Sequence, residues 1–315
     1  MSELSRMAQP LLDHPVVPAP PTNELRRRTV RRRQRHLLGG TTTVLVVAAV
    51  VMGATLAPSS PKPLGGPGSS SSLTAYIQKG VSVSDSTLES IGLPSSVTVP
   101  ASLPGGAPLT QDGKPVVVFV GGEFCPYCAM ERWALVVALS RFGTFSHLGQ
   151  TISSASNVVD PGLQSWSFMG STFTSPSLTF APAEIYSSTP NPTGTGFEPL
   201  QSLTPIQAKA YDTDTEDGGR GIPFVDIGGE FVAIGASADA AVLQNLSLDQ
   251  IAGQLDDPSS PVAQAVDGAA NYLIAAICSV TSTSAAPICN SPFIAQAQSM
   301  MAAHPFMAGA PLSGQ

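Results

Sequence analysis

A short apolar run followed closely by a longer, helix-like run is the clearest feature in the pattern of hydrophobic positions. Residues 115–120 are almost wholly apolar, and the run is short enough for a buried strand. Within 129–139, apolar residues recur three and four positions apart, which predicts a helix. Residues 114–143 are therefore predicted to form a strand–turn–helix unit, and a Gly-Gly pair permits the sharp turn.

Downstream of this unit, alternating and helix-like runs predict a mixed α/β architecture. Alternation predicts strands over 165–169 and 178–186, and residues 187–196 are expected to be a loop. Two apolar runs around a second Gly-Gly pair, 224–227 and 231–234, predict a β-hairpin. Periodicity and capping residues predict helices over 75–80, 87–92, 204–211, 247–255, 261–278 and 291–304.

The amino-terminal part of the chain has a different pattern. Residues 37–57 are uncharged and mostly apolar, and a helix of that length, at about 1.5 Å per residue, crosses a hydrocarbon layer of about 30 Å. Residues 1–36 hold eight arginines and three acidic residues, a net charge of +5, whereas residues 58–315 hold seven Lys or Arg and nineteen acidic residues, a net charge of −12. Arginine beside a span marks the cytoplasmic side. The sequence therefore predicts a cell-membrane protein with one span, a cytoplasmic amino terminus and an extracytoplasmic bulk.

Two alternatives exist for this amino-terminal region. Residues 55–57 would serve as a signal-peptide cleavage site, although a lead of 36 residues is long for a signal peptide. The arginines could also suggest nucleic-acid binding, but beside a span they are better explained by anionic membrane lipids, so no nucleic-acid partner is expected. Residues 58–74, rich in Pro, Gly and Ser, predict a linker to a domain over 75–315. Charged residues are 12% of the chain, against about 25% usually, a composition common among exported proteins.

The turn between the first predicted strand and helix carries the motif Cys125-Pro126-Tyr127-Cys128. The first N–H groups of a helix have no partners within it, and the helix dipole places about half a positive charge there. A thiolate at Cys125 is stabilised by both effects, so its pKa is expected below the usual value of about 8.5. Pro126 suits the first helical position. The motif is typical of thiol–disulfide exchange, with Cys125 attacking and the more shielded Cys128 resolving.

A structural disulfide and half of a metal site are the alternatives for this motif. Zinc usually takes four ligands, often from two such pairs. The other cysteines, Cys278 and Cys289, lie far downstream, and no histidine is near the motif in the sequence, so no metal is expected. Outside the cytoplasm disulfides persist, and Cys278 and Cys289 are predicted to form a structural disulfide around a short loop. A second redox-active pair is the alternative.

The order of strand, Cys-x-x-Cys helix, Ile-Pro, hairpin and final helices resembles the thioredoxin-like fold. In that fold a cis proline lies against the two cysteines, and Pro223 is the matching residue. The resemblance implies that Pro223 keeps metals from the sulfurs and that the backbone of Ile222 pairs with a substrate peptide. Pro126 and Tyr127 complete the expected substrate-binding site. The alternative is a trans proline that merely begins a strand.

The chain is also similar to a family catalogued as domain of unknown function 929, a group of membrane-anchored proteins with a thioredoxin-like region. The similarity covers most of residues 75–295 and is carried by 122–133, 167–186, 222–228 and 269–289. The family name implies no reaction. It therefore supports an expected fold and cellular placement more than a function.

Three departures from ordinary thioredoxins bear on the site. Phe124 replaces the Trp before the motif, a long insertion separates the motif helix from Pro223, and the strand 116–120 lacks the buried acid that assists proton transfer. Glu123 is the candidate replacement as proton acceptor, with a plain surface charge as the alternative. The Pro-Tyr dipeptide is similar to that of glutaredoxins, although no glutathione site is visible.

These observations predict an α/β fold, with a thioredoxin-like core, a long insertion and a C-terminal helical extension, preceded by one transmembrane helix. The predicted function is a membrane-anchored extracytoplasmic thiol–disulfide oxidoreductase without a cofactor. Its expected partners are exported protein thiols or disulfides and an unidentified membrane redox protein. The alternatives are a non-enzymatic binding or assembly protein and a copper-handling module, which the cysteine spacing disfavours. Arg132 is expected to be a surface or helix-pair residue, with a stabiliser of the thiolate as the alternative. Trp133 is expected to be a core residue.

Overall fold

The computed structural model describes residues 82–154, 158–213, 221–282 and 285–306. The predicted cytoplasmic tail, membrane span, linker and helix 75–80 all lie outside these residues. None of the helices within the described ranges has both the length and the apolar character needed to cross a membrane.

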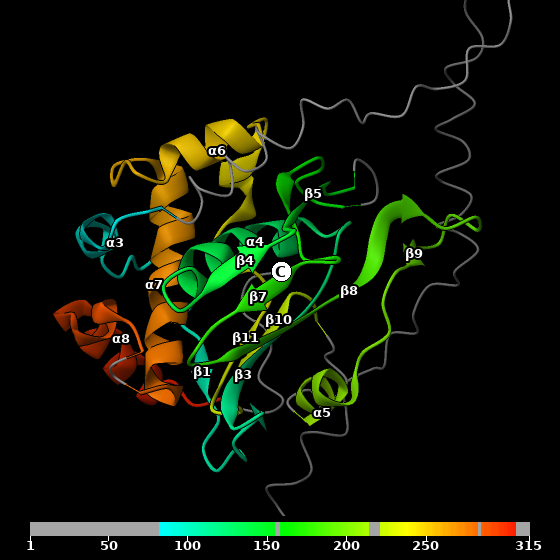
Figure 1. The fold of residues 1–315 in the computed structure, drawn as a ribbon. Helices are drawn as coiled ribbons and strands as arrows, with labels where there is room; N and C mark the ends of the chain where they lie inside the picture. The colour runs from blue at the N-terminus through cyan, green and yellow to red at the C-terminus, as the bar shows by residue number, and fades with distance from the viewer. Residues whose placement is uncertain (1–81, 155–157, 214–220, 283–284, 307–315) are drawn as a thin grey trace, which may run out of the picture. The chain divides into compact units, whose positions relative to one another are not determined.

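A mixed β-sheet forms the centre of the described part of the chain (Figure 1). Its strand order is β1 (Ala101–Ser102), β11 (Phe231–Ile234), β10 (Phe224–Ile227), β3 (Lys114–Gly122), β8 (Thr179–Pro190) and β9 (Phe197–Pro199), and β2 (Thr110–Gln111) pairs with the start of β3. The β3–β8 pair is parallel, and the other neighbouring pairs are antiparallel. The expected mixed α/β class is confirmed at this level.

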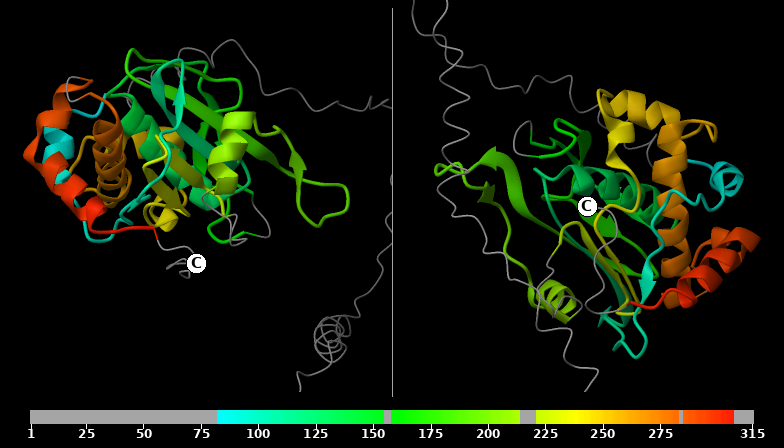
Figure 2. Two further views of the ribbon diagram at one scale, coloured as in Figure 1. Left: turned by 90° about the horizontal axis from the view of Figure 1, so that it is seen from below. Right: turned by 180° about the vertical axis from the view of Figure 1, so that it is seen from behind.

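Strand β3 is apolar from Val116 to Val120 because both faces of the sheet are covered there. Val117 and Phe119 face a core shared with α4 (Pro126–Leu139) and α7 (Pro261–Val280). Val116, Val118 and Val120 face a smaller core that includes Tyr211 of α5 (Pro205–Thr213). Helix α5 therefore lies on the opposite side of the sheet from α7 (Figure 2).

Helix α7 is the long buried helix predicted between the hairpin and the carboxyl terminus. It packs against α4, α3 (Asp85–Ile91), α6 (Leu248–Gln254) and α8 (Pro292–Ala302). Asn271, fully buried on α7, donates hydrogen bonds to the carbonyls of Leu88 and Gly92, and so fixes α3 against α7. A Cβ at Gly268 would lie 2.9 Å from Pro94, so only glycine permits this close approach.

The insertion between α4 and β10 contains two further strand pairs. Strand β4 (Thr144–Ser146) pairs with β7 (Thr172–Thr174), and β5 (Gly149–Ile152) pairs with β6 (Gln164–Ser167). The expected loop over 187–196 is partly wrong, because β8 continues to Pro190. This extension is held by antiparallel pairing of Pro190 with Phe197 and by a hydrogen bond from Ser188 Oγ to the Ile152 carbonyl.

Two local sequence signals predicted their elements closely. Gly228 and Gly229, in the hairpin turn, both have positive φ values of 68° and 72°, and a Cβ at Gly229 would lie 2.3 Å from the carbonyl oxygen of Ala107. Ser247 caps α6 in a capping box with Gln250, as its position predicted. Glycine conformation and side-chain capping therefore fix the boundaries of these elements.

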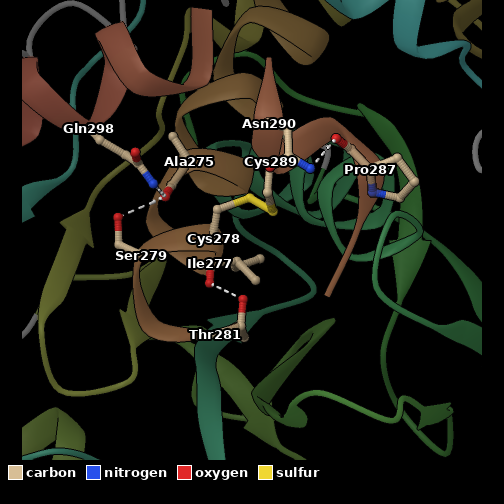
Figure 3. Close-up of a disulfide and its surroundings, with 9 residues drawn as sticks. All are labelled: Ala275, Ile277, Cys278, Ser279, Thr281, Pro287, Cys289, Asn290 and Gln298. Carbon is tan, nitrogen blue, oxygen red and sulfur yellow. Dashed lines mark hydrogen bonds between the residues drawn. A yellow bond between two sulfur atoms is a disulfide. The ribbon is translucent and has the colours of Figure 1, made fainter. Parts of the chain in front are cut away.

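The predicted disulfide between Cys278 and Cys289 is present (Figure 3). It joins the C-terminal end of α7 to η4 (Pro287–Asn290), with Cα atoms 5.6 Å apart. Helix α8 follows η4 directly, and Gln298 on α8 donates a hydrogen bond to the carbonyl of Ala275 on α7. The disulfide therefore holds the last helix against the long helix.

Replacing Cys278 and Cys289 together by alanine is expected to lower the free energy of unfolding by about 3 kcal/mol, because the bond restricts the unfolded chain. Denaturant unfolding of the full chain measures the loss. Ser279→Ala, which removes only a hydroxyl bonded to Ala275 on the same helix, is the control and should cost much less. Equal losses in the two variants would contradict a stabilising role for the bond.

Candidate functional site

Cys125 is the N-cap residue of α4, at the point where β3 ends and the helix begins. Its Sγ accepts a hydrogen bond from the backbone N–H of Cys128 at 3.2 Å, and Pro126 occupies the first turn. The pKa of Cys125 is lowered, first by the hydrogen bond from the Cys128 side chain, then by the Cys128 N–H and by the charge of Arg132. These contributions outweigh burial, which acts in the opposite direction. The thiolate of Cys125 is thus favoured by the helix terminus and by a nearby cation.

Cys128 has the opposite electrostatic environment. It is fully buried, and this desolvation raises its pKa well above the usual value. The hydrogen bond to Cys125 and the charge on that residue raise it further. One cysteine therefore favours the thiolate and the other the thiol, which is the asymmetry that an attacking and a resolving sulfur need.

Cys125 is less accessible than the motif suggested. Cys125 is only 4% exposed and Cys128 is 0% exposed. Cys128 is therefore the more shielded cysteine, as expected, but little of Cys125 is exposed either. The half-buried side chains of Phe124, Tyr127 and Ile222 pack against the core that includes Cys125. A partner can therefore reach this residue only over the small part of its surface that is exposed.

The Ile222–Pro223 bond lies beside the motif and is cis. The Sγ of Cys125 contacts the carbonyl oxygen of Ile222 at 3.9 Å, although the two residues are 97 positions apart in the sequence. Pairing of β10 with β3, which sets Phe224 opposite Val120, brings this bend to the motif. The structure thus brings together the six residues that the sequence assigned to the catalytic and substrate-binding groups: Cys125, Pro126, Tyr127, Cys128, Ile222 and Pro223.

The prediction for Arg132 is wrong. Its side chain is fully buried, and it forms a bidentate ion pair with the fully buried Glu184 of β8, at 2.8 Å from Nε and 2.7 Å from Nη2. Arg132 Nη2 also donates to the carbonyl of Gly122 at 2.8 Å. Burial opposes the charge on Arg132, but the charge and hydrogen bonds of Glu184 raise its pKa above the usual value. A permanent cation therefore lies inside the protein behind the motif.

Two further acids lie near the motif helix. Glu123, the candidate proton acceptor, is half-buried and accepts a hydrogen bond from Ser167 Oγ at 2.6 Å. Glu131 is fully buried, and its Oε2 accepts the backbone N–H of Ser237 at 3.0 Å. Burial raises the pKa of Glu131 to about 7, because the bonding to Ser237 offsets only part of the desolvation. Glu131 is thus a buried acid on α4 that is about half protonated at neutral pH.

Aromatic side chains of the insertion pack against the residue that precedes the motif. Phe124 stacks on Phe197 of β9 with ring centroids 4.0 Å apart, and its edge meets Tyr186 of β8. The backbone N–H of Glu123 donates to the carbonyl of Tyr186, and Ser154 donates to the carbonyl of Phe124. The residues just before Cys125 are therefore held between the β8–β9 hairpin and the loop after β5. Trp133 is buried as predicted and packs on Trp166.

The family model described as a domain of unknown function (DUF929) matches residues 105–210. Over these residues the chain is similar to the DUF929 family. No curated protein and no solved structure matches the chain. The DUF929 region includes the motif, Arg132 and Glu184, and it ends before Ile222, Pro223 and the disulfide. The predicted resemblance is thus confirmed over this region, and the DUF929 description assigns it no reaction.

Sequence reasoning missed Glu184 within the DUF929 region. Two signals could have found it: Arg132 is a lone base in an apolar helix, and Glu184 is a lone acid in an apolar stretch of strand. A charge in such a place needs a buried partner of opposite sign. Among the described residues, no group of three or more His, Cys, Asp or Glu side chains is placed to hold a metal ion.

Proposed function

We propose that this protein is a thiol–disulfide oxidoreductase with a thioredoxin-like core, in which Cys125 attacks and Cys128 resolves. The observation that carries the proposal is the position of Cys125. Its sulfur caps α4, accepts a backbone N–H and touches the carbonyl that precedes the cis Pro223. A cysteine that only staples two segments together needs neither a lowered pKa nor a neighbouring bend of this kind.

The reaction proceeds by two displacements at sulfur. The Cys125 thiolate attacks one sulfur of a substrate disulfide, the substrate S–S bond breaks, and the other substrate sulfur leaves as a thiolate. The Cys128 thiol then loses its proton and attacks Cys125, which breaks the mixed disulfide and releases the second substrate thiolate. The substrate gains two electrons, and the protein is left with a Cys125–Cys128 disulfide. The same steps in reverse oxidise a substrate dithiol.

Glu123 is the proposed acceptor of the Cys128 proton. It immediately precedes Phe124 at the end of β3, and only one of its carboxylate oxygens accepts the hydrogen bond from Ser167. Ile222, Tyr127 and Pro126 are the proposed contacts of the substrate backbone, because Pro126 and Tyr127 directly follow Cys125 and the carbonyl of Ile222 contacts its sulfur.

The proposal also places the reaction outside the cytoplasm. The arginine-rich residues 1–36 and the apolar residues 37–57 support an anchor in the cell membrane, with the acidic part of the chain on the far side. The substrates are then exported proteins with thiols or disulfides. A membrane redox partner must supply or remove the two electrons of each cycle.

Trapping of mixed disulfides tests the proposal. Cys128→Ala in the full chain, expressed in its native membrane, is expected to retain substrate proteins on Cys125, because the resolving displacement is lost. The bound proteins are seen as adducts on non-reducing gels that a dithiol releases. We expect adducts to be at least about tenfold more abundant than in the wild-type protein, in which the fully buried Cys128 resolves them.

Two matched variants separate exchange from a passive staple. Cys125→Ala should trap nothing, because Cys128 is fully buried, and Cys125→Ala with Cys128→Ala gives the background. Equal, low trapping by all variants would sink the proposal and favour a non-enzymatic protein in which the two cysteines form an inert disulfide.

A further inference from the structure

The buried ion pair behind the motif suggests a specific electrostatic role, which rests on the proposed function. We propose that Arg132 is a positioning residue that favours the thiolate form of Cys125, and that Glu184 sets how much of the arginine charge reaches the sulfur. The two residues then act as opposing controls on the reactivity of one cysteine.

Helical spacing places Arg132 on the same side of α4 as both sulfurs. Cys125, Cys128 and Arg132 are related by three, four and seven positions, and residues so spaced lie on one face of a helix. The carbonyl of Gly122 joins them more directly. It accepts a hydrogen bond from Arg132 Nη2 at 2.8 Å and one from the backbone N–H of Cys125 at 3.1 Å. The guanidinium and the reactive residue are thus bound to the same oxygen atom.

The ion pair with Glu184 does not engage every nitrogen of the Arg132 guanidinium. Nε and Nη2 are hydrogen-bonded, whereas Nη1, also fully buried, has no hydrogen-bond partner. Because the group is fully buried, its charge is screened less than it would be at the surface. Both cysteines are within its influence, since Arg132 lowers the pKa of Cys125 and also acts against the raised pKa of Cys128.

Glu184 is held in place by several elements of the insertion. Its residue lies opposite Gly121 in the parallel β3–β8 pair, and its Oε1 also accepts the backbone N–H of Phe168. The Gln201 side chain accepts the backbone N–H of Glu184, and the Gln201 N–H returns a bond to the Glu184 carbonyl. The counter-charge is therefore fixed by the fold, so its distance from the sulfur does not depend on side-chain mobility.

A purely structural ion pair and a tuning pair make different predictions for single substitutions. If the pair only supports the fold, Arg132→Met and Glu184→Gln both loosen the site and change Cys125 in the same direction. If Arg132 tunes the sulfur, the first substitution removes a cation and the second removes its counter-charge. The reactivity of Cys125 then changes in opposite directions in the two variants.

The experiment is a pH profile of Cys125 alkylation by iodoacetamide in the full chain, with Cys128→Ser in every variant so that one free thiol remains. At mildly acidic pH, Arg132→Met is expected to slow alkylation by about tenfold and Glu184→Gln to accelerate it severalfold, because the thiolate fraction changes. Thiolate absorbance over the same pH range should show the two titration curves displaced to opposite sides of the parent curve.

Arg132→Met with Glu184→Leu covers the case in which Arg132→Met fails to fold, because it removes both charges and leaves an apolar site. It should alkylate more slowly than the parent protein. Shifts of the same sign in the two single variants, or an unchanged profile in the folded double variant, would overturn the proposal. Alkylation needs no redox partner, so this result is independent of whether Cys128→Ala traps substrates.

Discussion

Glu184→Ala is expected to lower the free energy of unfolding by about 3–5 kcal/mol, because it leaves Arg132 charged and unpaired inside the protein. Both side chains of the pair are 0% exposed, so water cannot replace the lost carboxylate without opening the structure. The loss is measured by denaturant unfolding at neutral pH.

A variant that removes both charges isolates the electrostatic part of this loss. Arg132→Met with Glu184→Leu should cost much less than Glu184→Ala, because apolar groups of similar size remove the need for compensation. Glu198→Ala, on the exposed surface of β9, is the control and should change stability by less than about 0.5 kcal/mol. If the double variant lost as much stability as Glu184→Ala, the contribution of the pair to stability would come from packing and not from charge.

An ion pair therefore joins the motif helix to the insertion. Arg132 belongs to α4, and Glu184 to β8, and the pair also contacts Gly122 and the turn at Phe168. Loss of either partner should therefore disturb the same region that positions Cys125.

Local sequence signals predicted most of the elements that position the site. The apolar run before the motif, the Cys-Pro at the helix start and the Gly-Gly hairpin each have a physical cause within a few residues. Such causes act whatever the rest of the chain does. Strand β3, helix α4 and the β10–β11 hairpin were for this reason predictable with boundaries close to those observed.

Features that depend on distant residues were not predictable in the same way. Arg132 and Glu184 are 52 positions apart, and their contact follows from the parallel pairing of β3 with β8. The contact between the sulfur of Cys125 and the carbonyl of Ile222 joins residues 97 positions apart, and the length of β8 depends on its pairing with β9. A helix pattern indicates which residues are apolar, but it does not show where a single charge finds its partner.

Glu131 gives the second large effect, which is a pH dependence of stability. Burial raises its folded-state pKa from 4.5 to about 7, so the native protein binds this proton more tightly than the unfolded chain does. The stability that the proton contributes is fully present below about 4.5 and is lost as the pH rises through about 7. With about 1.4 kcal/mol for each pH unit, the cost above that range is about 3 kcal/mol.

Glu131→Gln is therefore expected to equal the wild-type protein near pH 4.5 and to exceed it by up to about 3 kcal/mol above neutrality. The amide keeps an oxygen for the Ser237 N–H but has no proton to lose. Denaturant unfolding across this pH range measures the difference. The exposed Glu230→Gln should leave the profile unchanged, and Asp267→Asn, at a second buried acid whose pKa burial also raises, should remove a separate part of the slope. A Glu131→Gln profile parallel to that of the wild type would mean that Glu131 is already ionised in the native protein, and that its burial has been offset by groups other than Ser237.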